Sequence, residues 1–378
     1  MRAQLDRLPR FALPIVAIIA AALLPLFFDP SSSFIGTSVL ALAFVVMALG
    51  LNVVVGFAGL LDLGYVAFYA VGAYCVGWFA STFYTDASVH IGVTKFLGLA
   101  PGIHVNFFLV MLIAMVFCVI AGIFIGLPTL RLRGDYIAIV TLAFGEIIRV
   151  FAVNGNDLHI LGKHYPLTNG QQGIGPLDSP KIPFVKQPLD PLHLRPWYWL
   201  ALGMVVIALI CVVAVRDSRI GRAWIAIRED EVAAASMGVP LVKTKLRAYA
   251  MGAALGGMAG SFLGFYNTTV NASDFKFAFS IFVLSMIILG GLGSIWGVVL
   301  GAIALTFINY QLIPNVLNGV PSSLGLDFQL SDLSYGIFGF LLVIGMVLKP
   351  EGLLPEGRRK IELTEGISSD ESVFEVRA

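Results

Sequence analysis

Long runs of apolar residues, separated by short polar stretches, set the pattern of this chain. A helix needs about 20 mostly apolar residues to cross the hydrocarbon core of a bilayer. The pattern therefore predicts an all-α, polytopic membrane protein with about ten transmembrane helices. The expected spans are 11–28, 34–56, 57–82, 105–128, 136–153, 196–215, 246–267, 276–292, 295–313 and 333–348.

The third span is the least regular of the ten. Asp62 stands near its start, and five glycines interrupt it: Gly56, Gly59, Gly64, Gly72 and Gly77. Non-helical backbone at membrane depth is tolerated only where protein or water satisfies the freed polar groups. The segment is predicted to be a broken or re-entrant helix.

Orientation follows from the lysines and arginines, which favour the cytoplasmic side of a membrane. With ten spans both termini share one side. That side holds Arg2, Arg7 and Arg10, the 129–134 turn, the 216–247 loop and the tail from 349, which together carry most of the basic residues. Both termini are therefore expected in the cytoplasm. No A-x-A-like cleavage site follows the first span, which favours a retained helix over a signal peptide.

This topology divides the chain into a transmembrane domain, 1–355, and a disordered cytoplasmic tail, 356–378. Within the domain, 216–247 is a cytoplasmic loop and 154–195, rich in Pro, Gly, Asn and His, is a periplasmic loop.

Composition agrees with a membrane protein. The chain is 58% hydrophobic and 12% charged, whereas soluble domains are about 25% charged. A net charge of +1 gives no basic footprint for nucleic acid. The three cysteines lie in apolar runs, and the five histidines fall in periplasmic segments where surface positions are expected, so neither set predicts a metal site.

Motifs for catalysis and for ATP binding are absent from the sequence. It contains no G-x-x-x-x-G-K-[ST], H-E-x-x-H or G-x-S-x-G. The chain is not expected to be an enzyme or to hold a cofactor. Any process driven by ATP would therefore need its energy from a separate protein.

The cytoplasmic loop between the sixth and seventh spans is the most informative stretch. It reads Arg219-Ile-Gly-Arg-Ala-Trp-Ile-Ala-Ile-Arg-Glu-Asp-Glu-Val-Ala-Ala-Ala-Ser-Met-Gly-Val-Pro240. A helix is predicted from about Arg222 to Met237, ended by Gly238 and Pro240. Such a helix either connects two spans in solvent or docks in the groove of a partner.

The loop resembles the cytoplasmic EAA loop of ABC importer permeases, whose pattern is Glu-Ala-Ala, three residues, then Gly. Val232, Ala233, Ala234 and Gly238 occupy those positions, and Glu231 stands one residue early. The segment from Gly221 to Ala233 is similar instead to one branch, the LivM-type permeases of branched-chain amino acid transport, written G-R-A-W-x-A-x-R-E-D-E-x-A.

Four further segments resemble the same branch. They are Asn52–Gly64, Leu130–Arg149, Val283–Ser294 with its Leu-Gly-Gly-Leu-Gly-Ser ending, and Lys349-Pro-Glu-Gly-Leu-Leu-Pro355. The chain departs from the branch at Thr168-Asn-Gly-Gln-Gln-Gly-Ile174, where the family reads Thr-Gly-Gly-x-Asn-Gly-Ile. Preference for substrate or binding protein is expected to differ there.

The resemblance implies a permease subunit of the bacterial inner membrane that carries leucine, isoleucine and valine. It also implies a second, LivH-like permease, two ATPase subunits of LivG and LivF type, and a periplasmic binding protein, besides membrane lipid. Alternatives are a urea or short-amide ABC permease and an ion-coupled secondary transporter. The residues expected to couple to the ATPase are Arg222, Trp224, Arg228, Glu229, Asp230, Glu231, Ala233, Ala234 and Gly238.

Polar residues inside the spans are candidates for the pathway, because ionisable groups at membrane depth are costly and face an interior or a cavity. Glu146 and Arg149 share a helix face and are expected to pair, either structurally or beside the pathway. Asp62 is a further candidate, and Asn52 is expected to form an interhelical hydrogen bond.

Glycines recur every four residues in two places, which lets another helix approach closely. One stripe comprises Gly252, Gly256, Gly260 and Gly264, and the other begins at Gly293 and Gly297. Packing within the subunit is the first interpretation, and a sliding interface at a permease seam or beside the pathway is the second.

Overall fold

A computed structural model describes residues 12–85, 87–92, 101–129, 136–156, 158–160, 163–181, 189, 193–317, 333–348 and 352–354. The N-terminal arginines, most of the 129–134 turn and the 356–378 tail lie outside these residues. The α-helices are α2 (Ala12–Leu23), α3 (Ser33–Asn52), α4 (Val66–Phe79), α5 (Phe107–Thr129), α6 (Tyr136–Asn154), α7 (Leu194–Arg216), α8 (Arg219–Glu229), α9 (Glu231–Ser236), α10 (Leu241–Asn267), α11 (Phe277–Gly290), α12 (Ile295–Phe307) and α14 (Ser334–Leu348).

Shorter helical turns extend or connect these helices. Two π-helices, Val53–Phe57 and Ile308–Leu317, continue α3 and α12, and three 3-10 turns cover Leu24–Leu26, Gly170–Gln172 and Ala272–Asp274. Because π-helices are rare and concentrate at functional sites, the ends of α3 and α12 are candidate functional positions.

Apolar helices dominate the described part of the chain. Six helical segments there are long and apolar enough to cross a membrane: Ser33–Phe57, Phe107–Thr129, Tyr136–Asn154, Leu194–Arg216, Leu241–Asn267 and Ile295–Asn315. Shorter apolar helices occupy the other predicted segments, at Val16–Leu26, Val66–Phe79, Phe277–Gly290 and Gly336–Gly345. The predicted all-α, multi-pass membrane class is confirmed.

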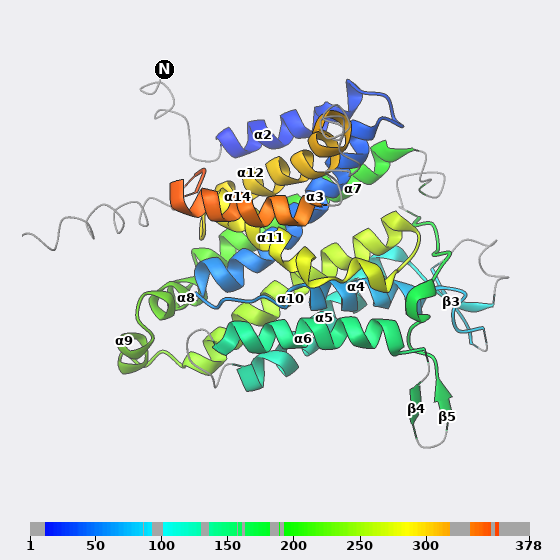
Figure 1. The fold of residues 1–378 in the computed structure, drawn as a ribbon, viewed down its shortest axis with the longest axis horizontal. Helices are drawn as coiled ribbons and strands as arrows, with labels where there is room; N and C mark the ends of the chain where they lie inside the picture. Colours follow the sequence, from blue (N-terminus) through cyan, green and yellow to red (C-terminus); the bar gives the residue numbers. More distant parts are fainter. Residues whose placement is uncertain are drawn as a thin grey trace, which may run out of the picture.

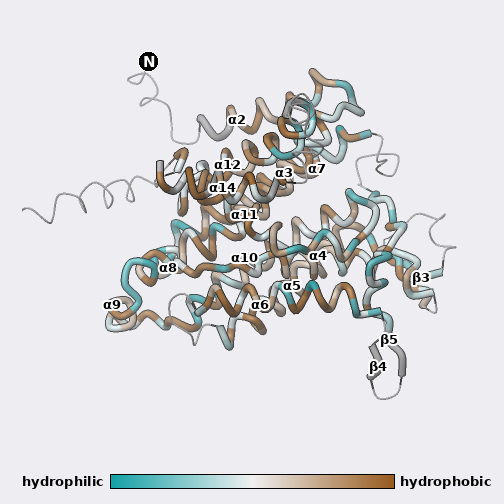
Figure 2. Tube along the Cα trace, viewed as in Figure 1, coloured by the Kyte–Doolittle hydropathy of each residue, from teal (hydrophilic) through white to brown (hydrophobic). Residues whose placement is uncertain are grey.

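The helices run between two ends of the molecule that differ in character. Helices α8 and α9 lie at one end, and strands β3 (Gly102–Val105), β4 (Leu158–Ile160) and β5 (Lys163–Tyr165) lie at the other (Figure 1). Hydrophobic residues line the helices between these ends, and hydrophilic residues gather near α8 and in the opposite loops (Figure 2). This distribution is the one that a bilayer requires.

The third predicted span is broken, as its glycines indicate. The helix begun by α3 ends in the π-helix Val53–Phe57, residues 58–65 form no helix, and α4 begins at Val66. Asp62 accepts a hydrogen bond from the amide of Gly64 at 2.8 Å and Thr141 Oγ1 accepts one from the amide of Leu63 at 3.1 Å. Side chains therefore satisfy backbone groups that the break leaves free.

Helices α3 and α10 are the most buried spans and form the centre of the bundle. The glycine stripe of α10 faces inward, toward the same chain. Gly252 lies against Gly50 of α3, and Gly256 and Gly260 lie against Phe68 and Tyr69 of α4. A methyl group at Gly260 would overlap the carbonyl oxygen of Tyr69. Close helix packing inside this subunit therefore uses the stripe.

The second stripe closes the turn between α11 and α12. Gly290 and Gly297 approach so closely that a methyl group on either would overlap the carbonyl oxygen of the other. Gly293 in the turn has φ +83°. The amides of Leu353 and Leu354 donate to the carbonyls of Leu289 and Gly290, so the segment 352–354 lies against this turn.

Small sheets, which the sequence did not predict, cover the end opposite α8. Strand β1 (Ala80–Ser81) pairs antiparallel with β3, and β2 (Ser88–Ile91) pairs with β3 in parallel; β4 and β5 form a hairpin. Strand β1 falls at the end of the predicted span 57–82 and β3 reaches the first residue of the span 105–128, whereas β2, β4 and β5 lie between predicted spans, so the membrane class is unaffected. Alternation in these strands is too short to predict a strand from the sequence.

The expected surface position of the histidines is wrong for His104. Its side chain is fully buried, and Nδ1 lies 2.8 Å from Asp178 Oδ2. Burial raises the pKa of Asp178, and the hydrogen bond and charge of His104 oppose that shift. The partner lies 74 residues away in the chain, so the sequence around His104 carries no sign of it.

Candidate functional site

The 216–247 loop forms two helices instead of the one predicted from 222 to 237. Ser218 caps α8, accepting from the amides of Ile220 and Gly221 at 3.2 and 3.4 Å. Asp230 has extended backbone angles and caps α9 through the amides of Val232 and Ala233 at 2.8 and 2.9 Å. The extended backbone of Asp230 ends α8, and its carboxylate satisfies the first amides of the new helix.

Helix α9 ends as the sequence indicates. Gly238 has φ +82°, and its amide donates to the carbonyl of Ala235 at 2.9 Å. The amide of Val239 donates to Ala234 at 3.0 Å. This pair of bonds is the Schellman motif, which favours glycine at the left-handed position.

Two residues of α8 point into the protein. Trp224 is 1% exposed, and its Nε1 donates to the carbonyl oxygen of Thr244 in α10 at 2.8 Å. Arg228 Nη1 donates to the carbonyl oxygen of Gly56, at the end of α3, at 2.5 Å. The helix is thus fixed to two different spans.

Helix α9 is attached more lightly. Lys245 of α10 is almost completely buried and pairs with Glu231 Oε1 at 2.7 Å. Ala234 is the buried residue of α9, whereas Val232 is 73% exposed and Met237, just past the helix, is 85% exposed. Apolar side chains are therefore exposed on the outer side of α9 and just past its end.

The nine predicted coupling residues therefore divide into three groups. Trp224, Ala234 and the partly buried Arg228 face the protein's own helices. Glu231 is partly buried through its ion pair, and the remaining five are exposed: Arg222, Glu229, Asp230, Ala233 and Gly238. We define the docking face as Val232, Ala233, Ala235, Ser236 and Met237, all exposed. Sequence reasoning missed Val232 and Met237, although both are apolar residues in a polar loop.

Two of the polar residues inside the spans are buried. Asn52 is fully buried, and its Oδ1 accepts from the amide of Gly293 at 3.0 Å, so it links two helical elements. Asp62 is 2% exposed. No described hydrogen bond or ion pair joins either residue to Glu146 or Arg149. A role for Asn52 and Asp62 in a pathway stays a prediction.

Glu146 and Arg149 of α6, unlike Asn52 and Asp62, are partly exposed. Arg149 Nε lies 2.7 Å from Glu146 Oε2, and the side chains are 40% and 36% exposed. A half-exposed ion pair within an apolar helix must meet water, a headgroup or a polar partner, because charge is costly against lipid tails. Its place in a pathway also stays a prediction.

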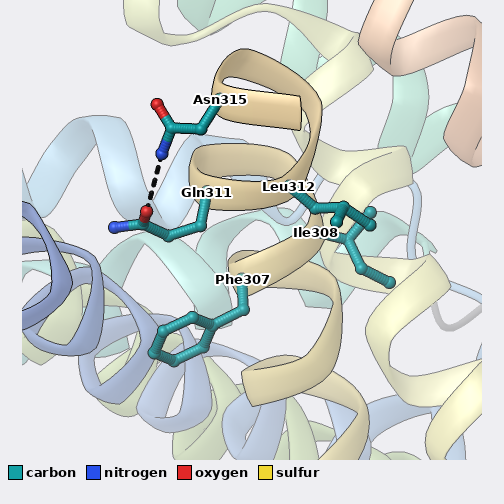
Figure 3. Close-up of a pocket in the computed structure, with 5 residues that line it drawn as sticks. All are labelled: Phe307, Ile308, Gln311, Leu312 and Asn315. Atoms are coloured by element: carbon teal, nitrogen blue, oxygen red, sulfur yellow. Dashed lines mark hydrogen bonds between the residues drawn. The ribbon is translucent and has the colours of Figure 1, made fainter. Parts of the chain in front are cut away.

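An amide pair on the π-helical end of α12 was missed by sequence reasoning. Gln311 Nε2 donates to Ser33 Oγ and Thr37 Oγ1 of α3, both at 3.0 Å, and its Oε1 accepts from Asn315 Nδ2 at 2.8 Å. Figure 3 shows Gln311 and Asn315 along an open hollow of about 440 Å³ beside Phe307, Ile308 and Leu312. The spacing of four between two amides in an apolar segment was the available signal.

These observations define a class of protein: a multi-pass α-helical membrane protein that presents a short, well-anchored helix pair at one aqueous end. Among the described residues no group of three or more His, Cys, Asp or Glu side chains is placed to hold a metal ion.

Comparison with known proteins identifies the family. Residues 33–346 match the permease component of the branched-chain amino acid transport system, and the chain belongs to this family. It is 33% identical to the high-affinity branched-chain amino acid transport system permease protein LivM of Escherichia coli K12, over 91% of this chain and 75% of that protein. No solved structure matches the chain.

More distant relatives extend the range. A probable branched-chain amino acid transport permease protein LivM of Methanocaldococcus jannaschii is 26% identical over 82% of this chain and 90% of its own. The permease protein LivH of Salmonella typhimurium is 26% identical over 43% of this chain. These relatives are transport permeases, so the expectation that this chain is not an enzyme is confirmed.

Proposed function

We propose that this chain is a transmembrane subunit of an ABC importer that carries leucine, isoleucine and valine across the bacterial inner membrane. The observation that carries the proposal is the family match over residues 33–346. The names of the similar LivM proteins support the substrate. In this proposal a second, LivH-like permease completes the pathway, two ATPase subunits of LivG and LivF type supply energy, and a periplasmic protein delivers the substrate.

The position and composition of the docking face support a role as the site where the ATPase subunit binds. It consists of small and apolar residues on a helix whose other side is fixed to α10. A short helix of this kind can fill a groove in a soluble partner. We propose that the ATPase subunit binds here, at the cytoplasmic end of the ten-span bundle.

Uptake by the purified complex in proteoliposomes tests the proposal. ATP inside the vesicles is expected to drive accumulation of leucine, isoleucine and valine when the binding protein is outside. Accumulation of urea or a short amide instead would contradict the proposed substrate and identify that compound as the substrate. Uptake that persists without ATP and stops when ion gradients are dissipated would replace the ABC mechanism with an ion-coupled one.

Replacement of Val232 by lysine tests the docking face. The charge is expected to lower retention of the ATPase subunits roughly tenfold or more, since a buried unpaired charge at an interface costs several kcal/mol. Retention is measured by co-purification in mild detergent. The control is V89K, because Val89 is 43% exposed on β2 at the opposite end. Equal retention of the ATPase subunits in both variants would contradict the docking face.

The proposed sidedness has its own test. Ser236→Cys places a thiol on the exposed part of α9. It is expected to react with an impermeant maleimide in inside-out vesicles and to stay unlabelled in intact spheroplasts, because the proposal puts α9 in the cytoplasm. Labelling from the outside would reverse the topology and with it the docking proposal.

A further inference from the structure

Arg228 faces away from the docking face and joins α8 to a distant span. Its hydrogen bond to the carbonyl of Gly56 connects residues 172 positions apart. We propose that Arg228 is a positioning residue that transmits movement of α8 into the transmembrane helices through the end of α3. This inference rests on the proposed function, because it assumes that a partner moves α8.

The contact is built on the end of a helix. The last carbonyls of a helix have no amide partners within it, and the chain leaves helical geometry after Phe57. Arg228 supplies one N–H of its charged guanidinium, that of Nη1, to such a carbonyl. Gly59, with φ +70°, brings the backbone against the aliphatic stem of Arg228; a methyl group there would lie 2.9 Å from Arg228 Cγ.

From Gly56 one route leads to the α11–α12 turn. A methyl group at Gly56 would overlap the Asn52 side chain and lie 2.8 Å from the amide nitrogen of Gly293. Asn52 in turn accepts from that amide at 3.0 Å. No free space separates these groups, so a shift of Gly56 must be met by Asn52 or by the turn that carries Gly293.

A second route leads to α6. The segment 58–65 continues from the Arg228 contact to Leu63, whose amide donates to Thr141 Oγ1. Gly64 lies directly against the Thr141 carbonyl, where a methyl group would overlap it. Helix α6 also carries the half-exposed pair of Glu146 and Arg149. One residue of α8 is therefore in packed contact with elements that lead to both α6 and α12.

Other contacts of the helix pair do not reach as far. Trp224 and Glu231 bind α10, which follows α9 in the chain, and Arg222 donates to the carbonyl of Asp217 just before α8. Among the described hydrogen bonds and ion pairs of α8 and α9, the Arg228 bond is the one that reaches a span other than α10. The geometry singles out this residue.

The test uses the full complex in proteoliposomes and compares R228Q and R228K with R219Q. R219Q is the matched control, since Arg219 is an exposed arginine of the same helix and is not one of the residues expected to couple to the ATPase. For both Arg228 variants we expect normal retention of the ATPase subunits and continued ATP hydrolysis. We expect substrate moved per ATP to fall roughly tenfold, within the usual range of coupling between sites. R228K should lose transport too, because lysine keeps the charge but ends in a compact ammonium group and lacks the Nη1 that donates to Gly56.

Three results would overturn the inference. Substrate moved per ATP could equal that of R219Q in both variants. Both variants could fail to assemble, which would assign Arg228 a purely structural role. R228K could transport normally, which would show that charge alone suffices. Failure of the proposed function looks different, because the unmodified complex would then show no ATP-dependent uptake.

Discussion

Replacing Gly260 by leucine is expected to destabilise the protein by about 3 kcal/mol or more, the upper part of the range for overpacking a filled core. The α-carbon of Gly260 lies against the backbone of α4, and even a methyl group would overlap the Tyr69 carbonyl. Backbone cannot move aside as a flexible side chain does, so α4 and α10 must separate. Thermal unfolding in detergent, followed by loss of the monodisperse complex, measures the effect.

The control is the same change at Gly203 of α7. Nothing lies within 4 Å of a methyl group added there. Since glycine weakens a helix interior by about 0.5–1 kcal/mol relative to alanine, G203L is expected to leave the melting temperature unchanged or slightly raised. Equal destabilisation by both changes would show that the glycine stripe of α10 does not determine helix approach.

Replacing Trp224 by alanine is expected to release α8 from α10, at a local cost of about 3–5 kcal/mol. The indole is 1% exposed and fills the space between the two helices, and its N–H is bonded to Thr244. Limited trypsin digestion measures the release, because Arg219 and Arg222 are exposed on the same helix. Cleavage there should accelerate strongly while the transmembrane bundle stays intact.

W296A is the matched control for this experiment. Trp296 of α12 is 40% exposed, so its removal leaves a smaller cavity. Its cleavage pattern around α8 should equal that of the unmodified protein. If W224A also showed no faster cleavage, the other contacts, at Arg228 and at Ser218, would suffice to hold α8.

Trp224 and Arg228 attach α8 to different parts of the protein. Trp224 fixes the helix to its neighbour in the chain, whereas Arg228 reaches the broken end of α3. A partner that binds the exposed side of α9 and displaces the helix pair would therefore pull on both attachments, at Thr244 and at Gly56. We expect loss of Trp224 to raise trypsin sensitivity of α8 without changing the substrate moved per ATP. Loss of Arg228 should lower the substrate moved per ATP without raising trypsin sensitivity. Comparing trypsin sensitivity with transport per ATP in both variants separates the two roles.

Local patterns in the sequence were sufficient for the membrane class and for most helix positions. A bilayer demands about 20 apolar residues for each crossing. Each span can therefore be predicted from its own residues, without knowledge of the rest of the chain. The glycine-rich third segment showed its break in the same way, since Gly59 and Gly64 stand where the backbone leaves the helix. The family resemblance was likewise legible in short motifs such as 221–233.

What only the tertiary structure decided depends on partners distant in the chain. The extended backbone at Asp230 splits the predicted helix in two, because its carboxylate caps α9. Arg228 and Lys245 resemble ordinary loop cations in the sequence, yet one binds a carbonyl at the end of α3 and the other lies buried beside Glu231. His104 is buried and hydrogen-bonded to Asp178, 74 residues away. Composition and periodicity report how a segment meets its solvent, whereas these pairings are set by which helices pack together.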